Sequence, residues 1–217
     1  MKLRKVLKTL RLTFLQVKSR ATLSWLKRRF RIIIERFSGL DYSSTIKQKK
    51  LGLSASMVNL GSPSSKETLR EIFENVEIKN SDRILDIGCA KGFAINYFLD
   101  LPFARVAGLE ISDTLISICK RNIQRQHGLQ VDLFHADATT FNGYGDYNYF
   151  YLYNPFPSRE ILEKVVAQIT CYTAGKIFVI YNNPVNSEVF TEQGFLLEKR
   201  LDDPKSMNKQ IFIFSKQ

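Results

Sequence analysis

Apolar runs and helical patterns alternate along the chain from residue 83 onward. Five short, β-prone apolar runs predict strands: 83–88, 105–110, 130–134, 147–153 and 176–181. Three stretches between them carry apolar residues at helical spacing: 93–99, 113–126 and 158–173. Because a strand–helix–strand unit forms a right-handed crossover between parallel strands, this alternation predicts a parallel sheet covered by helices.

The C-terminal end follows a different pattern. Two further apolar runs, 194–200 and 210–215, are separated by a polar loop with no insert long enough for a helix. Such a pair predicts an antiparallel hairpin. We therefore expect an α/β domain over residues 66–217, with a seven-stranded, mostly parallel sheet that the C-terminal hairpin closes.

The N-terminal segment is basic and amphipathic. Apolar residues recur at helical spacing over 2–18 and again over 23–37, with Lys and Arg mostly at the other positions. Residues 1–36 hold twelve Lys and Arg against one acid, Glu35. The net charge of this segment therefore equals the +11 of the whole chain. The remaining residues hold twenty bases and twenty acids, so the charge balance gives little support for nucleic-acid binding by the domain.

A basic helix with one apolar face is typical of segments that lie on an anionic membrane surface, and we predict this for residues 1–37. Simple packing on the domain is the main alternative; a nucleic-acid arm or an organelle-targeting peptide also fits the pattern. The domain division that follows is a basic amphipathic segment at 1–38, a Ser- and Gly-rich linker or cap at 39–65, and the α/β domain at 66–217.

Cysteine spacing and hydropathy predict a cytoplasmic protein, with peripheral membrane attachment through the basic segment. Cys89, Cys119 and Cys171 form no C-x-x-C pair, which excludes a zinc ribbon and favours a reducing compartment. The sequence has no apolar run of the roughly 18–20 residues that span a bilayer, and no signal-peptide pattern.

The first predicted strand leads into a glycine-containing turn, R-I-L-D-I-G-C-A-K-G-F at 83–93. The strand brings Asp86 and Gly88 to its carboxyl end, and a helix begins after Gly92. The spacing is D-x-G-x-x-x-G and not the G-x-G-x-x-G that cradles a pyrophosphate. An acid before the turn would repel phosphate but suits a ligand with a cationic amino group, such as S-adenosylmethionine. A bare strand–helix turn is the alternative interpretation.

Two further acids follow the next two strands. Glu110 ends the second strand, about 20 residues after the glycine turn, where a carboxylate accepts hydrogen bonds from ribose hydroxyls. Asp137 follows the third strand, where it can accept from an adenine amino group. One acid after a strand is usually a turn or helix cap. Three acids at successive strand ends predict one crevice that binds an adenosyl ligand.

On these motifs, the chain from about residue 83 to its C-terminus resembles the class I, Rossmann-like S-adenosylmethionine-dependent methyltransferases. The resemblance implies that Asp86, Gly88 and Gly92 form the loop around the methionine part of the cofactor, that Glu110 holds the ribose and that Asp137 holds the adenine. Three neighbouring residues complete the predicted cofactor site: Cys89, Lys91 and Ala138. Ala90 departs from the pattern by standing where a middle glycine is expected.

The fourth strand ends in Y-L-Y-N-P-F-P at 151–157. This sequence resembles the Asn/Asp-Pro-Pro-Tyr/Phe element of amino-group methyltransferases, with Phe156 where the second proline would be. The resemblance implies that Asn154 positions the acceptor and that Phe156 packs on it. The alternative is a strand end stopped by proline, with Asn154 capping the turn. The basic N-terminal helix together with this Asn-Pro-Phe strand end also resembles a group of small class I methyltransferases.

The resulting prediction is methyl transfer from S-adenosylmethionine to an unidentified acceptor, through an amino or hydroxyl group. One alternative is an RNA or DNA methyltransferase that uses the basic segment as an arm. A second is a non-catalytic, membrane-associated adapter that keeps the fold and binds the cofactor without turnover.

Overall fold

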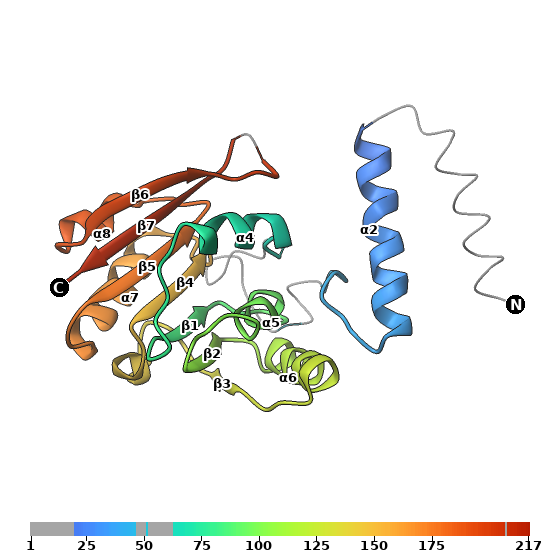
Figure 1. The fold of residues 1–217 in the computed structure, drawn as a ribbon, viewed down its shortest axis with the longest axis horizontal. Coiled ribbons are helices and arrows are strands. Elements are labelled where there is room, and N and C mark those ends of the chain that lie inside the picture. Colours follow the sequence, from blue (N-terminus) through green and yellow to red (C-terminus); the bar gives the residue numbers. More distant parts are fainter. Residues whose placement is uncertain (1–19, 47–50, 52–62, 207) are drawn as a thin grey trace, which may run out of the picture. The chain divides into compact units, whose positions relative to one another are not determined.

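The computed structural model describes residues 20–46, 51, 63–206 and 208–217 (Figure 1). The chain divides into two compact units, residues 1–44 and 45–217. The predicted helix over 2–18 and most of the predicted linker over 39–65 lie outside the described residues. The three-part domain division therefore stays a prediction.

The first unit contains helix α2, Arg20–Phe37. No Gly or Pro interrupts this stretch, which suits a helix, and the chain turns at Gly39, whose φ of 72° is easy for glycine. The backbone N–H of Leu40 donates to the carbonyl of Glu35 at 2.7 Å, a bond typical of a helix C-terminus. Among the described residues no helix is both long enough and apolar enough to cross a membrane.

The second unit alternates helices and strands as the sequence predicts. Its helices are α4 (Lys66–Glu74), α5 (Phe93–Phe98), α6 (Asp113–His127), the 3₁₀ turn η1 (Gly143–Asp146), α7 (Arg159–Tyr172) and α8 (Glu188–Glu192). Its strands are β1 (Arg83–Ile87), β2 (Arg105–Glu110), β3 (Asp132–His135), β4 (Tyr149–Tyr153), β5 (Ile177–Asn182), β6 (Leu196–Asp202) and β7 (Gln210–Lys216). The short elements η1 and α8 were not predicted.

The strands form one seven-stranded sheet in the order β3-β2-β1-β4-β5-β7-β6. The first five strands of this order are parallel, whereas β7 is antiparallel to both β5 and β6. The predicted fold class is confirmed. The hairpin folds back so that its second strand, β7, lies between β5 and β6.

Helices cover both faces of the sheet (Figure 1). On one face, α7 and α8 pack on Leu85, Phe150 and Val179 from the central strands. On the other, α4, α5 and α6 pack on alternate positions of the same strands, such as Ile84 and Tyr151. Side chains alternate between faces along a strand. Positions 86 on β1, 110 on β2, 151 and 153 on β4, and 182 on β5 therefore share the α4–α6 face.

The β6–β7 loop is tied to the first turn of α4. The hydroxyl of Ser65 accepts a hydrogen bond from the backbone N–H of Thr68 at 3.0 Å and so caps the helix. The hydroxyl of Thr68 in turn donates to the Asp203 carboxylate at 2.8 Å, and Lys205 pairs with Glu67 at 3.0 Å. These contacts hold the loop at the edge of the sheet where the parallel strands end.

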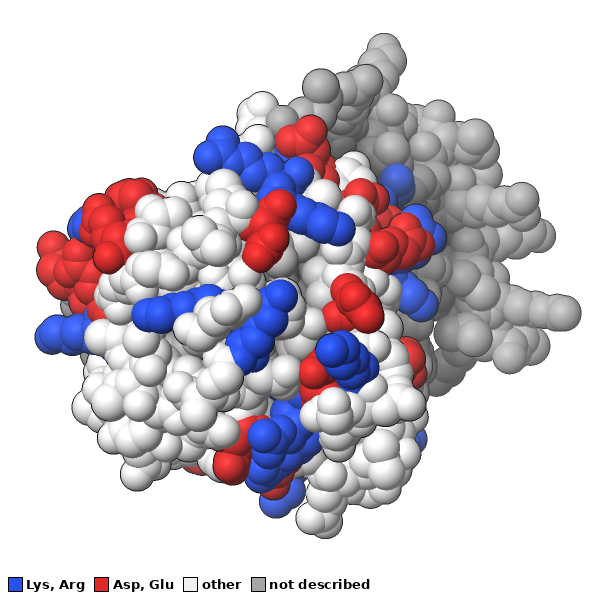
Figure 2. Space-filling model, turned by 60° about the vertical axis from the view of Figure 1, so that its left-hand side comes forward, with Lys and Arg blue, Asp and Glu red and all other residues white. Residues whose placement is uncertain are grey.

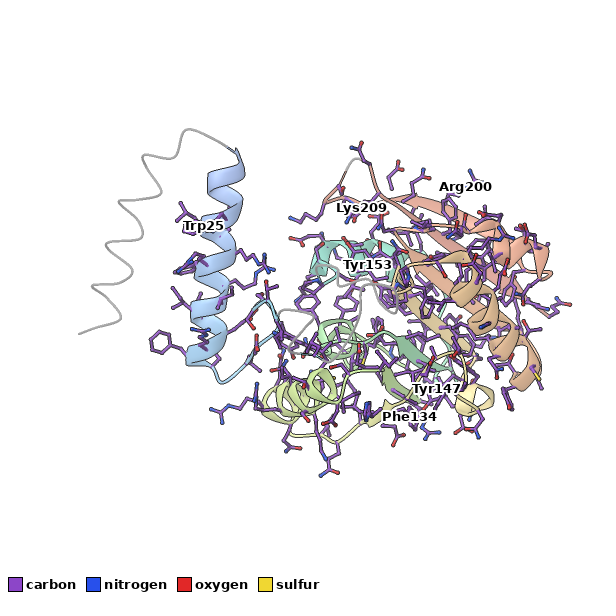
Figure 3. All side chains as sticks on the ribbon, turned by 180° about the vertical axis from the view of Figure 1, so that it is seen from behind. Trp25, Phe134, Tyr147, Tyr153, Arg200 and Lys209 are labelled. Atoms are coloured by element: carbon purple, nitrogen blue, oxygen red, sulfur yellow. The ribbon has the colours of Figure 1, made fainter. Side chains whose placement is uncertain are left out.

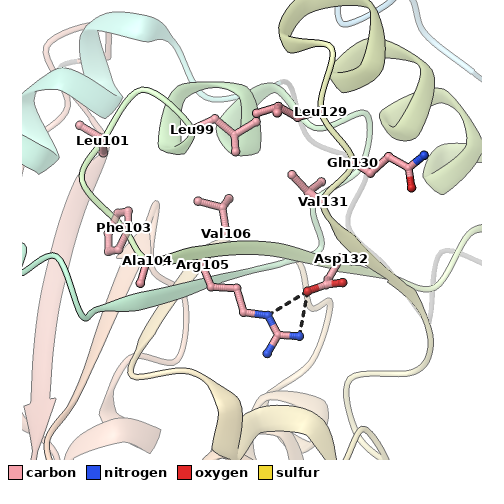
Figure 4. A pocket seen from close by; sticks show the side chains of 10 residues that line it. All are labelled: Leu99, Leu101, Phe103, Ala104, Arg105, Val106, Leu129, Gln130, Val131 and Asp132. Atoms are coloured by element: carbon pink, nitrogen blue, oxygen red, sulfur yellow. Dashed lines mark hydrogen bonds and ion pairs between the residues drawn. The ribbon is translucent and has the colours of Figure 1, made fainter.

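A hollow of about 260 Å³ lies at the opposite ends of the strands, where β2 and β3 begin (Figure 4). Seven of its ten lining residues are apolar. Arg105 donates to the carboxylate of Asp132 at 2.8 Å and to that of Asp146 at 3.1 Å. The charged groups there are thus paired with one another, and ligands of open α/β sheets bind at the other edge.

Candidate functional site

The loop after β1 makes a tight, left-handed turn. Gly88 and Gly92 have φ angles of 80° and 81°, and Ala90 adopts 47°. Only glycine adopts such angles without strain, and an L-residue there costs about 1–2 kcal/mol. Ala90 thus adopts the left-handed conformation that a glycine would take at this position, and it does so at this cost.

The N–H groups of this loop are used within the protein. Those of Gly88 and Cys89 both donate to the carbonyl of Leu109, at 2.8 and 3.1 Å, and that of Gly92 donates to the carbonyl of Cys89 at 2.8 Å. The N–H of Ala90 donates to the Glu110 carboxylate at 3.0 Å. A loop that cradles phosphate needs such groups free to point at the anion. These four donors are not free for that role.

Both ends of the loop are closely packed. A Cβ atom added to Gly88 would lie 2.8 Å from the Cβ of Pro155, at the end of β4. One added to Gly92 would lie 2.4 Å from the sulfur of Cys119, on α6. Glycine is thus required here for space as well as for backbone angle. The contact with Pro155 places the predicted acceptor element directly against the predicted cofactor loop.

Glu110 joins this loop to the start of α6. Its carboxylate is 6% exposed and accepts from the N–H of Ala90 on one oxygen and from that of Ser112 on the other, both at 3.0 Å. Ser112 caps α6 through the N–H of Leu115. Each carboxylate oxygen keeps a second acceptor position, which can receive the hydroxyl pair of a ribose. Burial raises the pKa of Glu110, and the N–H groups of Ser112 and Ala90 partly offset this.

Asp86 lies on the same face of the sheet as Glu110. Its side chain is 3% exposed, and within the described part of the chain its carboxylate accepts no hydrogen bond. Burial, and then the charge of Glu110, raises the pKa of Asp86 well above its ordinary value. A buried carboxylate without a donor is costly for the fold, unless a cationic group of a ligand pairs with it.

Asp137 lies just beyond the end of β3, where it was predicted, but it is exposed. One of its oxygens accepts from both the N–H and the hydroxyl of Thr139 at 2.8 Å, which makes it a turn cap as well as a site candidate. The carbonyl of the following residue, Ala138, accepts from the buried hydroxyl of Tyr144 at 2.7 Å. This bond fixes the backbone beside Asp137.

The remaining loop residues, Cys89 and Lys91, are both buried. The Cys89 side chain lies in the core under the loop, where a hydrogen bond with Cys119 and burial raise the pKa of its thiol. Cys89 can therefore contribute to a ligand site through its backbone alone. The carbonyl of Lys91 accepts from the amide of Asn122 on α6 at 3.0 Å, which holds the loop against that helix.

Asn154 directly follows β4 and has a left-handed conformation, with φ of 41°. Asparagine tolerates this conformation better than most residues. The hydroxyl of Tyr181, on β5, donates mainly to the carbonyl of Val185 at 2.8 Å and shares its hydrogen with the Asn154 side-chain oxygen at 3.4 Å. The neighbouring Phe156 is partly buried against the core cluster of α7. Asn154 thus both turns the chain and presents a side-chain oxygen that is held in place.

Sequence reasoning missed several polar residues around this strand end. The buried hydroxyl of Tyr151 bonds to the Ser64 hydroxyl at 2.6 Å and accepts from the Asn182 amide at 3.0 Å. Lys209, in the β6–β7 loop, donates to the Tyr153 hydroxyl at 3.0 Å (both residues are labelled in Figure 3). The sequence pattern that could have predicted these residues is the alternation along β4, which puts positions 151 and 153 on the same face of the sheet as Asp86.

The second unit matches known proteins in sequence and in fold. Residues 84–170 match the family model described as a methyltransferase domain. No curated protein sequence matches the chain. Solved structures do match, and the three described below are each at most 19% identical, so they inform on the fold.

An RNA methyltransferase from Salinibacter ruber, in complex with S-adenosyl-L-homocysteine, is 12% identical with a TM-score of 0.56, covering 70% of this chain and 92% of that one. A ribosomal protein L11 methylase from Lactobacillus delbrueckii subsp. bulgaricus is 14% identical with a TM-score of 0.58, covering 83% and 92%. A putative RNA methyltransferase from Pyrococcus horikoshii is 19% identical with a TM-score of 0.53, covering 69% and 81%.

The matched family and the strand order together define the α/β unit as a class I, Rossmann-like methyltransferase domain. The chain therefore carries a methyltransferase domain, of the class that uses S-adenosylmethionine. The predictions of fold, enzyme class and cofactor are confirmed, whereas the assignment of individual site residues stays a prediction.

Proposed function

We propose that the chain transfers the methyl group of S-adenosylmethionine to an amino or hydroxyl group of an acceptor that enters beside Asn154. Two features next to each other carry this proposal. The N–H groups of the loop already make hydrogen bonds within the protein, and two buried carboxylates, Asp86 and Glu110, lie on the same face of the sheet. This arrangement disfavours a phosphate and favours a ligand that has a cationic amino group and ribose hydroxyls.

The roles of the cofactor residues follow from their positions. Asp86 pairs with the amino group of the methionine part, since its buried carboxylate has no donor among the described residues. Glu110 accepts from the ribose hydroxyls with its remaining acceptor positions while it keeps the loop attached to α6. Asp137 uses its second oxygen for the adenine amino group, and Ala138 lies beside it on backbone fixed by Tyr144.

The cofactor, when bound, supplies an electrophilic methyl group on a sulfonium. For an amino acceptor, what the protein adds is alignment, because methyl transfer to a neutral amine needs little acid–base help and the ammonium that forms loses its proton to water. Asn154 lies next to Pro155, which touches the glycine loop, so an acceptor held by its side-chain oxygen is presented towards that loop. In-line placement of two reacting groups accounts for a large part of many enzymatic rate enhancements.

Calorimetric titration with S-adenosylmethionine, S-adenosylhomocysteine and NAD tests the cofactor assignment. We expect micromolar affinity for the first two and none for NAD, because the loop offers no free N–H cradle for a pyrophosphate. Binding of NAD with comparable affinity would contradict the proposed site. Cofactor binding with no methyl transfer to any component of a cell extract would instead favour the adapter function.

Replacement of Asn154 by glycine tests its positioning role. Glycine keeps the left-handed backbone conformation and removes only the side chain, so the fold should be retained. We expect transfer of radiolabelled methyl to extract acceptors to fall on the order of 10–100-fold, with unchanged cofactor affinity. Asn186→Gly makes the same change at another left-handed asparagine, φ 56°, and serves as the control. Equal transfer by both variants would leave Asn154 as a turn residue.

A further inference from the structure

Helix α2 carries a continuous apolar stripe. Five residues of the stripe recur at helical intervals: Leu26, Phe30, Ile33, Ile34 and Phe37. Two of them are strongly exposed, Ile34 at 49% and Phe37 at 74%. Trp25 lies beside the stripe near the start of the described side chains and is 55% exposed (Figure 3). Exposed aromatic and aliphatic residues on one helix face are costly in water and indicate a binding surface.

Basic residues border this stripe on both sides. At 3.6 residues per turn, Arg29 and Arg36 flank one edge, and Lys27 and Arg31 flank the other. All four side chains belong to exposed residues. The guanidinium of Arg29 lies over the Trp25 ring at 4.9 Å. Within the part of the chain that the structure describes, no ion pair involves any of the four.

The one acid of residues 1–36, Glu35, lies away from this cationic surface. The buried Glu35 carboxylate accepts from the N–H groups of Tyr42 and Ser43, at 3.0 and 2.8 Å, and from the Ser43 hydroxyl at 2.6 Å. Glu35 points to the side of α2 opposite the apolar stripe. The returning segment 38–44 therefore covers the polar side of the helix and leaves the stripe and its basic borders uncovered by that segment.

We propose that α2 docks on an anionic lipid surface, with the stripe towards the acyl chains and the flanking Lys and Arg at the headgroup phosphates. Apolar burial and the attraction of cations to anionic lipid both favour this position. A nucleic acid would engage the cations but leave the apolar stripe in water. On the face of the domain that Figure 2 shows, Lys and Arg are interspersed with Asp and Glu, so this face has no uniformly basic surface.

Sedimentation of the full chain with vesicles tests the docking. We expect binding to vesicles of phosphatidylcholine with phosphatidylglycerol, and not to phosphatidylcholine alone, weakening as salt is raised. Trp25 is the only tryptophan of the chain, so its emission should shift to shorter wavelength on binding. The double variant Ile34→Ser with Phe37→Ser should bind at least about tenfold more weakly. Leu129→Ser with Leu196→Ser changes two exposed leucines of the domain and should bind as the parent does.

A charge-reversal pair separates the lipid from other polyanions. Lys27→Glu with Arg31→Glu should reduce vesicle binding, whereas Lys120→Glu with Arg121→Glu, exposed on α6, makes the same net charge change and should not. Thermal unfolding of each variant confirms that it is folded. Equal loss in both charge variants, or vesicle binding that survives removal of Ile34 and Phe37, would overturn the proposal. So would binding of an RNA or DNA duplex, but not vesicles, that depends on Lys27 and Arg31.

Discussion

Asp86→Asn should make the protein more stable and at the same time a poorer binder of its cofactor. We expect the free energy of unfolding at pH 7 to rise by roughly 1–3 kcal/mol, because a buried ionisable group without a hydrogen-bond donor becomes a neutral amide of the same shape. Affinity for S-adenosylmethionine should fall on the order of 10–100-fold, which is the loss of one charged hydrogen bond of about 1.5–3 kcal/mol. Residues that serve a ligand commonly reduce stability in this way.

The pH dependence of stability tests independently whether the ionised Asp86 side chain destabilises the fold. Burial and Glu110 raise the pKa of Asp86 in the folded protein above its value in the unfolded chain. Between the two values the folded protein holds the proton and the unfolded chain has lost it, so this group makes stability fall as pH rises above its unfolded pKa. Below that pH both states are protonated and the group has no effect. The Asp86→Asn substitution should remove this decline, and Asp100→Asn, at an exposed position, should not.

Cofactor binding should show the opposite trend with pH. A cationic amino group binds the ionised carboxylate better than the protonated acid, so affinity for S-adenosylmethionine should increase as pH rises through the raised pKa of Asp86. Calorimetry across this range, with the parent and Asp86→Asn, measures the dependence directly. If the two proteins have the same affinity at every pH, Asp86 does not contact the cofactor.

Much of this site follows from periodicity in the sequence. Period-two alternation along β1 and β2 places Asp86 and Glu110 on one face, and both strands were predicted within one residue of their observed bounds. Ser65, a residue type that favours helix N-termini, lies directly before α4 and does cap that helix. These are local signals, in which the residue types that specify the structure lie next to one another in the chain.

Other features depend on contacts between distant segments. The insertion of β7 between β5 and β6 requires pairing across the whole sheet. The contact of Pro155 with Gly88 and the hydrogen bond from Tyr181 to Asn154 arise only once β1, β4 and β5 lie side by side. The use of the Ala90 N–H by Glu110 also comes from the assembled loop. This bond gives a second reason, besides the acid before the turn, why the motif disfavours phosphate.

Gly92→Ala should have the largest effect of any single methyl group added to the loop. The backbone there has φ of 81°, which costs an alanine about 1–2 kcal/mol. The added Cβ would also lie 2.4 Å from the Cys119 sulfur, inside a packed cluster, and overpacking typically costs a further ~1–3 kcal/mol. We expect a loss of unfolding free energy equal to the sum of these two contributions, with weaker cofactor binding because the loop must shift.

Gly175→Ala separates the two contributions. Gly175 has φ of 82°, but an added Cβ there meets no atom within 4 Å, so this variant should lose only the backbone part. Cys119→Ala removes the clashing sulfur, after which the Cβ of residue 119 lies 3.5 Å from the new methyl group, an ordinary contact. Combining it with Gly92→Ala should therefore cost less than the two single changes added together. Denaturant unfolding of the four variants measures this coupling. If Gly92→Ala is no more destabilising than Gly175→Ala, α6 does not constrain the loop, and the cofactor residues are positioned by β1 and Glu110 alone.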